Sequence, residues 1–145
     1  MKKIILAMVA VMVPLMLSAG STDFWFRHFS VEDGLSSSAV RAIMQDKYGF
    51  MWLGTDDGLN RYDGTTIKIY RLNPEGVNDY ISFLYDTTDR IWIGTGDGVY
   101  IYDYETENFE PFKLLTAKGD SIKTNVNHIA EDRDGNLWFS TVGQG

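Results

Sequence analysis

The sequence contains no cysteine, and this absence excludes disulfide bonds, thiolate catalysis and zinc sites built on cysteine. Histidine is scarce: His28 and His128 are the only two, and nothing near them has the spacing of a catalytic triad or a metal site. No phosphate-binding loop or dinucleotide fingerprint occurs either. The sequence therefore predicts neither a metal nor a cofactor.

Positive charge is also limited, with 13 basic residues against 20 acidic residues and a net charge of −7. This balance argues against a nucleic-acid groove, which needs a basic surface, and gives no reason to expect attraction to anionic lipid. What the chain does have is 44% hydrophobic residues, 14% aromatic residues and 14 glycines. These values are typical of a globular, β-rich protein.

The first 20 residues differ from the rest. Lys2 and Lys3 precede an apolar run over residues 4–17, and small residues follow over residues 18–20. This order is typical of a secretory signal peptide, and the run is short for a membrane span, which needs about 20 apolar residues. We predict a signal peptide over residues 1–20, with a retained anchor as the alternative, and export of residues 21–145.

A repeat organises the exported part. Three tryptophans are separated by 40 and 46 residues, and each has an Asp six positions before it and a Thr three positions after it. The nine residues are Asp46, Trp52, Thr55, Asp86, Trp92, Thr95, Asp132, Trp138 and Thr141. A period of this length is typical of one four-stranded blade of a β-propeller.

The pattern within the first copy agrees with four short strands. Alternating or continuous apolar segments are separated by Gly-containing breaks, two of which are the hairpin signal Asp-Gly. We predict one blade over residues 39–72, a second over residues 79–114 and a partial blade over residues 126–145. Pro111 falls in the fourth strand of the second copy, as expected for the outer edge of a blade.

Residues 24–31 share the aromatic-polar-apolar pattern of the fourth strands. We interpret them as an orphan outer strand that completes the last blade of a closed ring. The predicted fold is thus an all-β, incomplete β-propeller of four-stranded antiparallel blades: an orphan outer strand plus about two and a half blades. Because a ring needs at least four blades, we expect an N-terminal piece of a longer protein that folds poorly alone.

The repeated residues are interpreted as structural. A Trp at the same point of each copy predicts packing between blades, and small neighbours permit close approach: Trp52, Gly54, Thr55, Trp92, Gly94, Thr95, Trp138 and Thr141. The acidic pair at residues 56–57 is interpreted as a hairpin turn, not as a catalytic pair. Residues 132–136 resemble the start of a calcium loop, but Gly143 stands where such a loop needs Glu.

The segments between the copies are unequal in length and composition, at residues 31–39, 73–79 and 115–125. Loops at one rim of a repeat scaffold commonly carry its binding surface. The candidate ligand contacts in these loops are Glu32, Asp33, Asn73, Glu75 and Asn78.

Residues 29–64, FSVEDGLSSSAVRAIMQDKYGFMWLGTDDGLNRYDG, resemble the opening of the two-component regulator propeller repeats in hybrid two-component systems. The second copy departs from that pattern at Thr88-Asp89-Arg90. The resemblance implies a periplasmic sensor region, followed in the family by an immunoglobulin-like domain, a membrane helix anchored in the inner membrane, a histidine kinase core and a receiver. It also implies a homodimer that responds to oligosaccharides.

We therefore expect this chain to be the front of the sensor propeller of a hybrid histidine kinase, with no enzymatic activity in this segment and signal transduction through the missing kinase. Two alternatives remain open. One is a secreted propeller glycoside hydrolase or lyase, because residues 134–138 partly resemble the turns of sialidase-like propellers. The other is a propeller that binds only protein partners.

Overall fold

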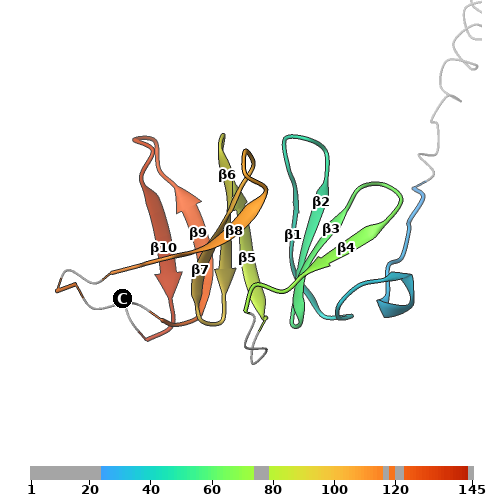
Figure 1. Cartoon of the computed structure of the whole chain (residues 1–145), viewed down its shortest axis with the longest axis horizontal. Helices are drawn as coiled ribbons and strands as arrows, with labels where there is room; N and C mark the ends of the chain where they lie inside the picture. Colours follow the sequence, from blue (N-terminus) through green and yellow to red (C-terminus); the bar gives the residue numbers. More distant parts are fainter. Residues whose placement is uncertain (1–23, 74–78, 116–117, 120–122, 144–145) are drawn as a thin grey trace, which may run out of the picture.

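A computed structural model describes residues 24–73, 79–115, 118–119 and 123–143, and these residues form three antiparallel sheets side by side (Figure 1). Two sheets have four strands each, in the orders β1-β2-β3-β4 and β5-β6-β7-β8, and the third pairs β9 with β10. The strands are β1 (Val40–Gln45), β2 (Met51–Thr55), β3 (Gly58–Tyr62), β4 (Ile67–Tyr70), β5 (Ile81–Asp86), β6 (Arg90–Thr95), β7 (Gly98–Asp103), β8 (Asn108–Phe112), β9 (Val126–Glu131) and β10 (Leu137–Thr141). The predicted all-β fold of four-stranded antiparallel blades is confirmed.

The repeated threonine holds the second hairpin of each complete blade. The hydroxyl of Thr55 donates to the Gly58 carbonyl at 2.9 Å and accepts from the Asp57 backbone N–H at 3.1 Å. Thr95 makes the same two bonds at 3.0 and 3.2 Å, to the carbonyl of Gly98 and from the N–H of Asp97. Both threonines are buried, so the turn is fixed by an internal side chain.

The repeated glycine lets the next blade approach. A Cβ atom placed on Gly54 would lie 2.5 Å from Cγ2 of Ile81, the first residue of β5. A Cβ atom on Gly94 would lie 3.0 Å from the carbonyl oxygen of Val126, the first residue of β9. The first strands of successive blades therefore pack directly against the glycine of the blade before them.

The tryptophans form the contact between blades. Trp52 is fully buried and its ring lies 5.1 Å from Tyr102 and 6.4 Å from Phe109, both in the second blade. Trp92 is 8% exposed and lies 5.8 Å from Phe139 of the third copy. Burial of a large apolar side chain stabilises a fold by about 1.5 to 3 kcal/mol, so these contacts stabilise the packing of one blade on the next.

Trp138, in the third copy, is 64% exposed. Its backbone position in β10 corresponds to Trp52 in β2 and Trp92 in β6, and its indole still donates to Asp132 at 2.8 Å. In the described part of the chain no further blade lies against this face. Tryptophan burial thus follows the presence of the next blade.

The register corrects one element of the predicted repeat. Trp52 pairs with Met44, and Trp92 pairs with Tyr85. Asp46 therefore lies two residues after the partner of Trp52, whereas Asp86 lies only one residue after the partner of Trp92. The β5–β6 turn is one residue shorter than the β1–β2 turn, and Asp86 is not the structural equivalent of Asp46. That Asp86 has the same sequence offset from tryptophan as Asp46 is a coincidence of turn length.

The segment of residues 24–31 also differs from the prediction, because it forms no strand in this structure. Val31–Asp33 form a short 3-10 helix, η1, in which the Ser30 backbone N–H donates to the Asp33 carboxylate at 2.8 Å. This capping interaction turns the chain before Val31, and both four-stranded sheets already have their own fourth strand. Completion of another blade by this segment stays a prediction.

The predicted signal peptide over residues 1–20 lies outside the described residues. Within the residues described, no helix has the length and apolar character to cross a membrane.

Candidate functional site

An open depression of about 450 Å³ lies at the rim where β1, β5 and β9 begin, here called the start rim. It is lined by Arg41, Asp56, Tyr80, Gly96 and Asn125, which come from all three copies of the repeat. These residues are brought together because the first strands of successive blades lie next to one another.

Backbone hydrogen bonds show which of these positions are equivalent. The N–H of Asp56 donates to the Ala39 carbonyl at 3.2 Å, and the N–H of Gly96 donates to the Tyr80 carbonyl at 3.1 Å. In the third copy the N–H of Val142 donates to the Asn125 carbonyl at 3.0 Å. The residue before the first strand of each copy is thus Ala39, Tyr80 or Asn125 in turn. The residue after the repeated threonine is Asp56, Gly96 or Val142.

A β-bulge directs the Arg41 side chain. The register of the first hairpin shifts between Val40 and Ala42, which leaves Arg41 as the extra residue. The second blade has the same shift around Ser82. Bulges re-aim side chains next to binding sites, so the scaffold presents a different residue at the same point of each blade.

Arg41 and Asp56 form a two-pronged ion pair. Nε of Arg41 donates to Oδ1 of Asp56 at 2.7 Å, and Nη2 donates to Oδ2 at 3.0 Å. The hydrogen bond to the guanidinium lowers the pKa of Asp56 and raises that of Arg41, so both groups are charged at neutral pH. Cζ of Arg41 also lies 5.9 Å from the centre of the Tyr80 ring.

Asn125 supplies an unused acceptor. Its side-chain Oδ1 is buried and has no hydrogen-bond partner among the described residues. A buried amide oxygen without a partner costs about 1 to 3 kcal/mol, and a ligand hydroxyl that donated to it would remove this cost.

The depression therefore combines a planar cation–carboxylate pair, an amide and an aromatic ring. Such groups form paired hydrogen bonds with vicinal hydroxyls, while the ring provides an apolar surface. Among the described residues no three His, Asp or Glu side chains are placed to hold a metal ion.

The predicted loop residues lie elsewhere. Glu32 and Asp33 are exposed in η1, where both carboxylates accept from the Ser30 hydroxyl, at 2.6 and 3.0 Å. The backbone N–H of Asn73 donates to the Asp79 carboxylate at 2.8 Å. None of these three lines the depression, and Glu75 and Asn78 fall outside the described residues.

Sequence reasoning missed Arg41, Tyr80 and Asn125, and treated Asp56 as a turn residue. The signal that finds them is variation at fixed positions of the blade, not variation in loop length. Arg41, Ser82 and Asn127, the extra residue at the register shift of each copy, differ in charge and size although their backbones are equivalent.

Comparison with known proteins shows which proteins this chain is similar to. The sequence profile of the two-component regulator propeller matches residues 34–57 and 121–143. Histidine kinase P4 of Formosa agariphila is 56% identical over 59 residues, which make up 41% of this chain and 4% of that protein. The chain thus spans a small part of this curated relative.

Solved structures show the same fold. The extracellular domain assigned to the hybrid two-component system BT3049 of B. thetaiotaomicron is similar with a TM-score of 0.68 and 30% identity, over 78% of this chain and 17% of that one. The extracellular domain assigned to the hybrid two-component system BT4673 of B. thetaiotaomicron has a TM-score of 0.65 and 25% identity, over 82% of this chain and 18% of that one. Two segments of the chain, residues 34–57 and 121–143, therefore match the two-component regulator propeller repeat, and the fold is similar to that of extracellular domains of hybrid two-component systems.

Proposed function

We propose that this chain is the front of the extracytoplasmic sensor region of a hybrid histidine kinase, and that the depression at the start rim contacts an oligosaccharide. The observation that carries the ligand proposal is the convergence of Arg41, Asp56, Tyr80 and Asn125 from three copies of the repeat. Their side chains are the non-repeating groups on a repeating scaffold, as expected of a binding surface.

The proposed signal is a change in the population of two arrangements of the sensor region. A ligand shifts such an equilibrium only as far as its affinities for the two states differ. In this proposal the region is periplasmic, is tethered to the inner membrane by a downstream helix and acts as a homodimer. The depression has walls from different blades, so its ligand is sensitive to their relative position.

A glycoside hydrolase has less support. Hydrolysis needs a carboxylic acid whose pKa is raised so that it can protonate the leaving group. In the depression the carboxyl of Asp56 has its pKa lowered by Arg41, and each of its oxygens accepts one hydrogen bond from the guanidinium, which leaves a second lone pair for a ligand hydroxyl. Asp56 is placed to bind hydroxyls, not to donate a proton.

The test is calorimetric titration of the exported region of the intact protein with a panel of oligosaccharides. Arg41→Gln and Asp56→Asn remove the ion pair of the depression, and we expect each to weaken binding about tenfold or more. Arg71→Gln and Asp57→Asn are matched controls, because Arg71 and Asp57 form an equivalent pair 2.6 Å apart outside the depression. Equal loss in both pairs, or binding to no oligosaccharide, would contradict the proposal.

A further inference from the structure

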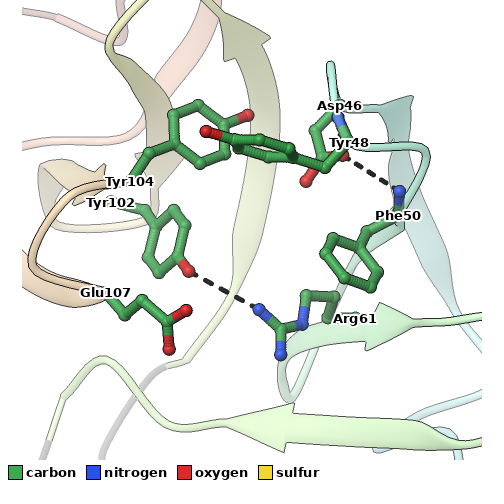
Figure 2. Close-up of a pocket in the computed structure, with 7 residues that line it drawn as sticks. All are labelled: Asp46, Tyr48, Phe50, Arg61, Tyr102, Tyr104 and Glu107. Carbon is green, nitrogen blue, oxygen red and sulfur yellow. Dashed lines mark hydrogen bonds between the residues drawn. The ribbon is translucent and has the colours of Figure 1, made fainter.

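A second pocket of about 340 Å³ lies between the first two blades, at the opposite rim (Figure 2). We call it the inter-blade pocket. The β1–β2 turn and β3 contribute Asp46, Tyr48, Phe50 and Arg61. The end of β7 and the β7–β8 turn contribute Tyr102, Tyr104 and Glu107. None of these residues lines the depression at the start rim.

Aromatic rings form most of the wall. Tyr48 and Tyr104 meet edge to face across the blade boundary, with ring centres 5.2 Å apart, and Tyr102 lies 5.5 Å from Tyr104. Figure 2 shows these rings on one side of the pocket and Phe50 facing them. Tyr48 is 63% exposed, so its ring is accessible from solvent. Tyr102 is 3% exposed and the Lys47 ammonium lies 4.4 Å from the Tyr104 ring centre, so Tyr48 is the tyrosine that offers an apolar surface to a ligand of one-ring size.

Arg61 carries unused donors into the pocket. Its guanidinium lies over Phe50 and Trp52, with Cζ 4.7 and 5.7 Å from the ring centres. Its Nη1 donates to the Tyr102 hydroxyl at the long distance of 3.5 Å. Within the described residues it makes no ion pair. A guanidinium has five N–H donors, so most of them are free for a ligand.

Glu107 supplies an acceptor on the other side of the pocket (Figure 2). It is exposed, and its backbone has φ of 53°, the one positive value among the described residues other than glycine. The left-handed conformation favours Gly or Asn and costs a residue such as Glu about 1 kcal/mol or more. A residue held in this conformation at a pocket is a signal of function.

Asp46 is a pocket residue whose carboxylate is already occupied. It accepts from the Trp52 indole at 2.7 Å and from the backbone N–H groups of Tyr48 and Phe50 at 2.9 Å each. Its role is to hold the turn and the wall in place. The Tyr104 hydroxyl is also occupied, because it donates to Asp86 at 2.8 Å. The polar groups left for a ligand are therefore Arg61, Glu107 and the hydroxyls of Tyr48 and Tyr102.

The charges select the class of ligand. The pocket holds two carboxylates and one guanidinium, and the Lys47 ammonium lies 5.1 and 4.4 Å from the Tyr48 and Tyr104 ring centres, so the charges balance and an anion gains no net attraction. A cation would meet Arg61 in the same small space. A neutral ring with several hydroxyls suits all the groups, because it donates to Glu107, accepts from Arg61 and stacks its C–H face on tyrosine.

We propose that the inter-blade pocket binds one neutral pyranose unit of a carbohydrate. This inference does not depend on the depression at the start rim, because the two sites share no residue. The pocket spans two blades, so its ligand stabilises their contact by binding the folded state alone.

Saturation-transfer difference NMR on the exported region of the intact protein tests the proposal, with the methyl pyranosides of glucose, galactose and mannose as probes. Glucuronate and tetramethylammonium serve as the anionic and cationic counterparts. We expect transfer to the C–H protons of at least one neutral probe and weaker binding of both charged probes. Binding to none of the three neutral probes, or stronger binding of a charged probe, overturns the proposal.

Variants locate the site. Tyr48→Ala and Glu107→Gln change exposed side chains, and we expect each to weaken binding of the neutral probe about tenfold. Tyr80→Ala, in the depression, is expected to leave this binding unchanged while it weakens the oligosaccharide binding proposed above. Unchanged binding of the neutral probe in both pocket variants overturns the inter-blade site and leaves the proposed function standing. Loss of probe binding in Tyr80→Ala alone likewise overturns the inter-blade site and leaves the proposed function standing.

Discussion

At the scale of single residues, the repeat is defined by what each side chain does for the next blade. Gly54 is required because Ile81 occupies the space that a Cβ atom would need, and Trp52 is buried because the second blade covers it. The third copy has Ser140 at the glycine position, and Ser140 is exposed. Burial at these positions thus reports contact with a neighbouring blade.

Gly54→Ala is expected to lower the free energy of unfolding by about 1 to 3 kcal/mol, because the added methyl group would lie 2.5 Å from Ile81 Cγ2. Ser140→Ala changes the equivalent position where no described blade packs, and should have little effect. Urea unfolding followed by tryptophan fluorescence measures both. A destabilisation of Ser140→Ala as large as that of Gly54→Ala would show that the glycine is not a contact requirement.

Asp46 and Asp86 have the same sequence offset from tryptophan but different roles. Asp46→Ala would leave the buried indole N–H of Trp52 without its acceptor, which costs about 1 to 3 kcal/mol. Asp86 is half-buried and accepts from the Tyr104 hydroxyl and the Lys47 backbone, so Asp86→Ala should cost less. Thermal unfolding ranks the two; the reverse order would refute the register difference between the blades.

At the scale of elements, the blade could be predicted from the sequence because its signals are local. Alternating apolar residues and Asp-Gly turns define strands and hairpins within a few residues of one another. The site depends on comparison of positions about 40 residues apart, and the shorter β5–β6 turn shifts this comparison by one residue. An alignment of the copies on tryptophan makes Tyr80 equivalent to Val40, whereas the strand register makes Tyr80 equivalent to Ala39. Successive residues of a strand point to opposite faces of the sheet, so a shift of one residue in the alignment assigns each side chain to the wrong face.

The β7–β8 turn provides a test of its strained residue. Glu107→Gly should raise the free energy of unfolding by up to about 1 kcal/mol, because glycine adopts a φ of 53° without strain. The same change should weaken the neutral-sugar binding proposed for the inter-blade pocket. Glu105→Gly, two residues earlier in the turn, is the control and should not stabilise. Chemical unfolding paired with the NMR titration measures both effects; a destabilised Glu107→Gly would contradict the reading of this turn.

The β9–β10 turn makes the free energy of unfolding depend on pH. Hydrogen bonds from the Trp138 indole, Asn136 and the turn backbone lower the pKa of Asp132 to about 2. A carboxyl whose pKa is lowered on folding stabilises the protein above its unfolded pKa of about 3.9, and this stabilisation is lost as the pH falls toward 2. Asp132→Asn should flatten the fall in unfolding midpoint over that range. Asp134→Asn, whose side chain takes no part in these bonds, should keep it.

At the scale of the whole molecule, the described residues are a sector of successive blades whose first strands lie together and whose last tryptophan is open to solvent. The scaffold repeats, while Arg41, Asp56, Tyr80 and Asn125 do not. This separation of repeating support from non-repeating surface carries the proposal of a sensor. It predicts that substitutions in the depression change the response to ligand and leave the fold intact.

The most direct test measures kinase autophosphorylation of the intact protein in membranes, with and without the oligosaccharide identified by calorimetry. The account predicts that the ligand changes the rate in the wild-type protein and in the Arg71→Gln control, and that Arg41→Gln loses the change while its basal rate is kept. A response of Arg41→Gln equal to that of the wild type would contradict the central claim that the start-rim depression receives the signal.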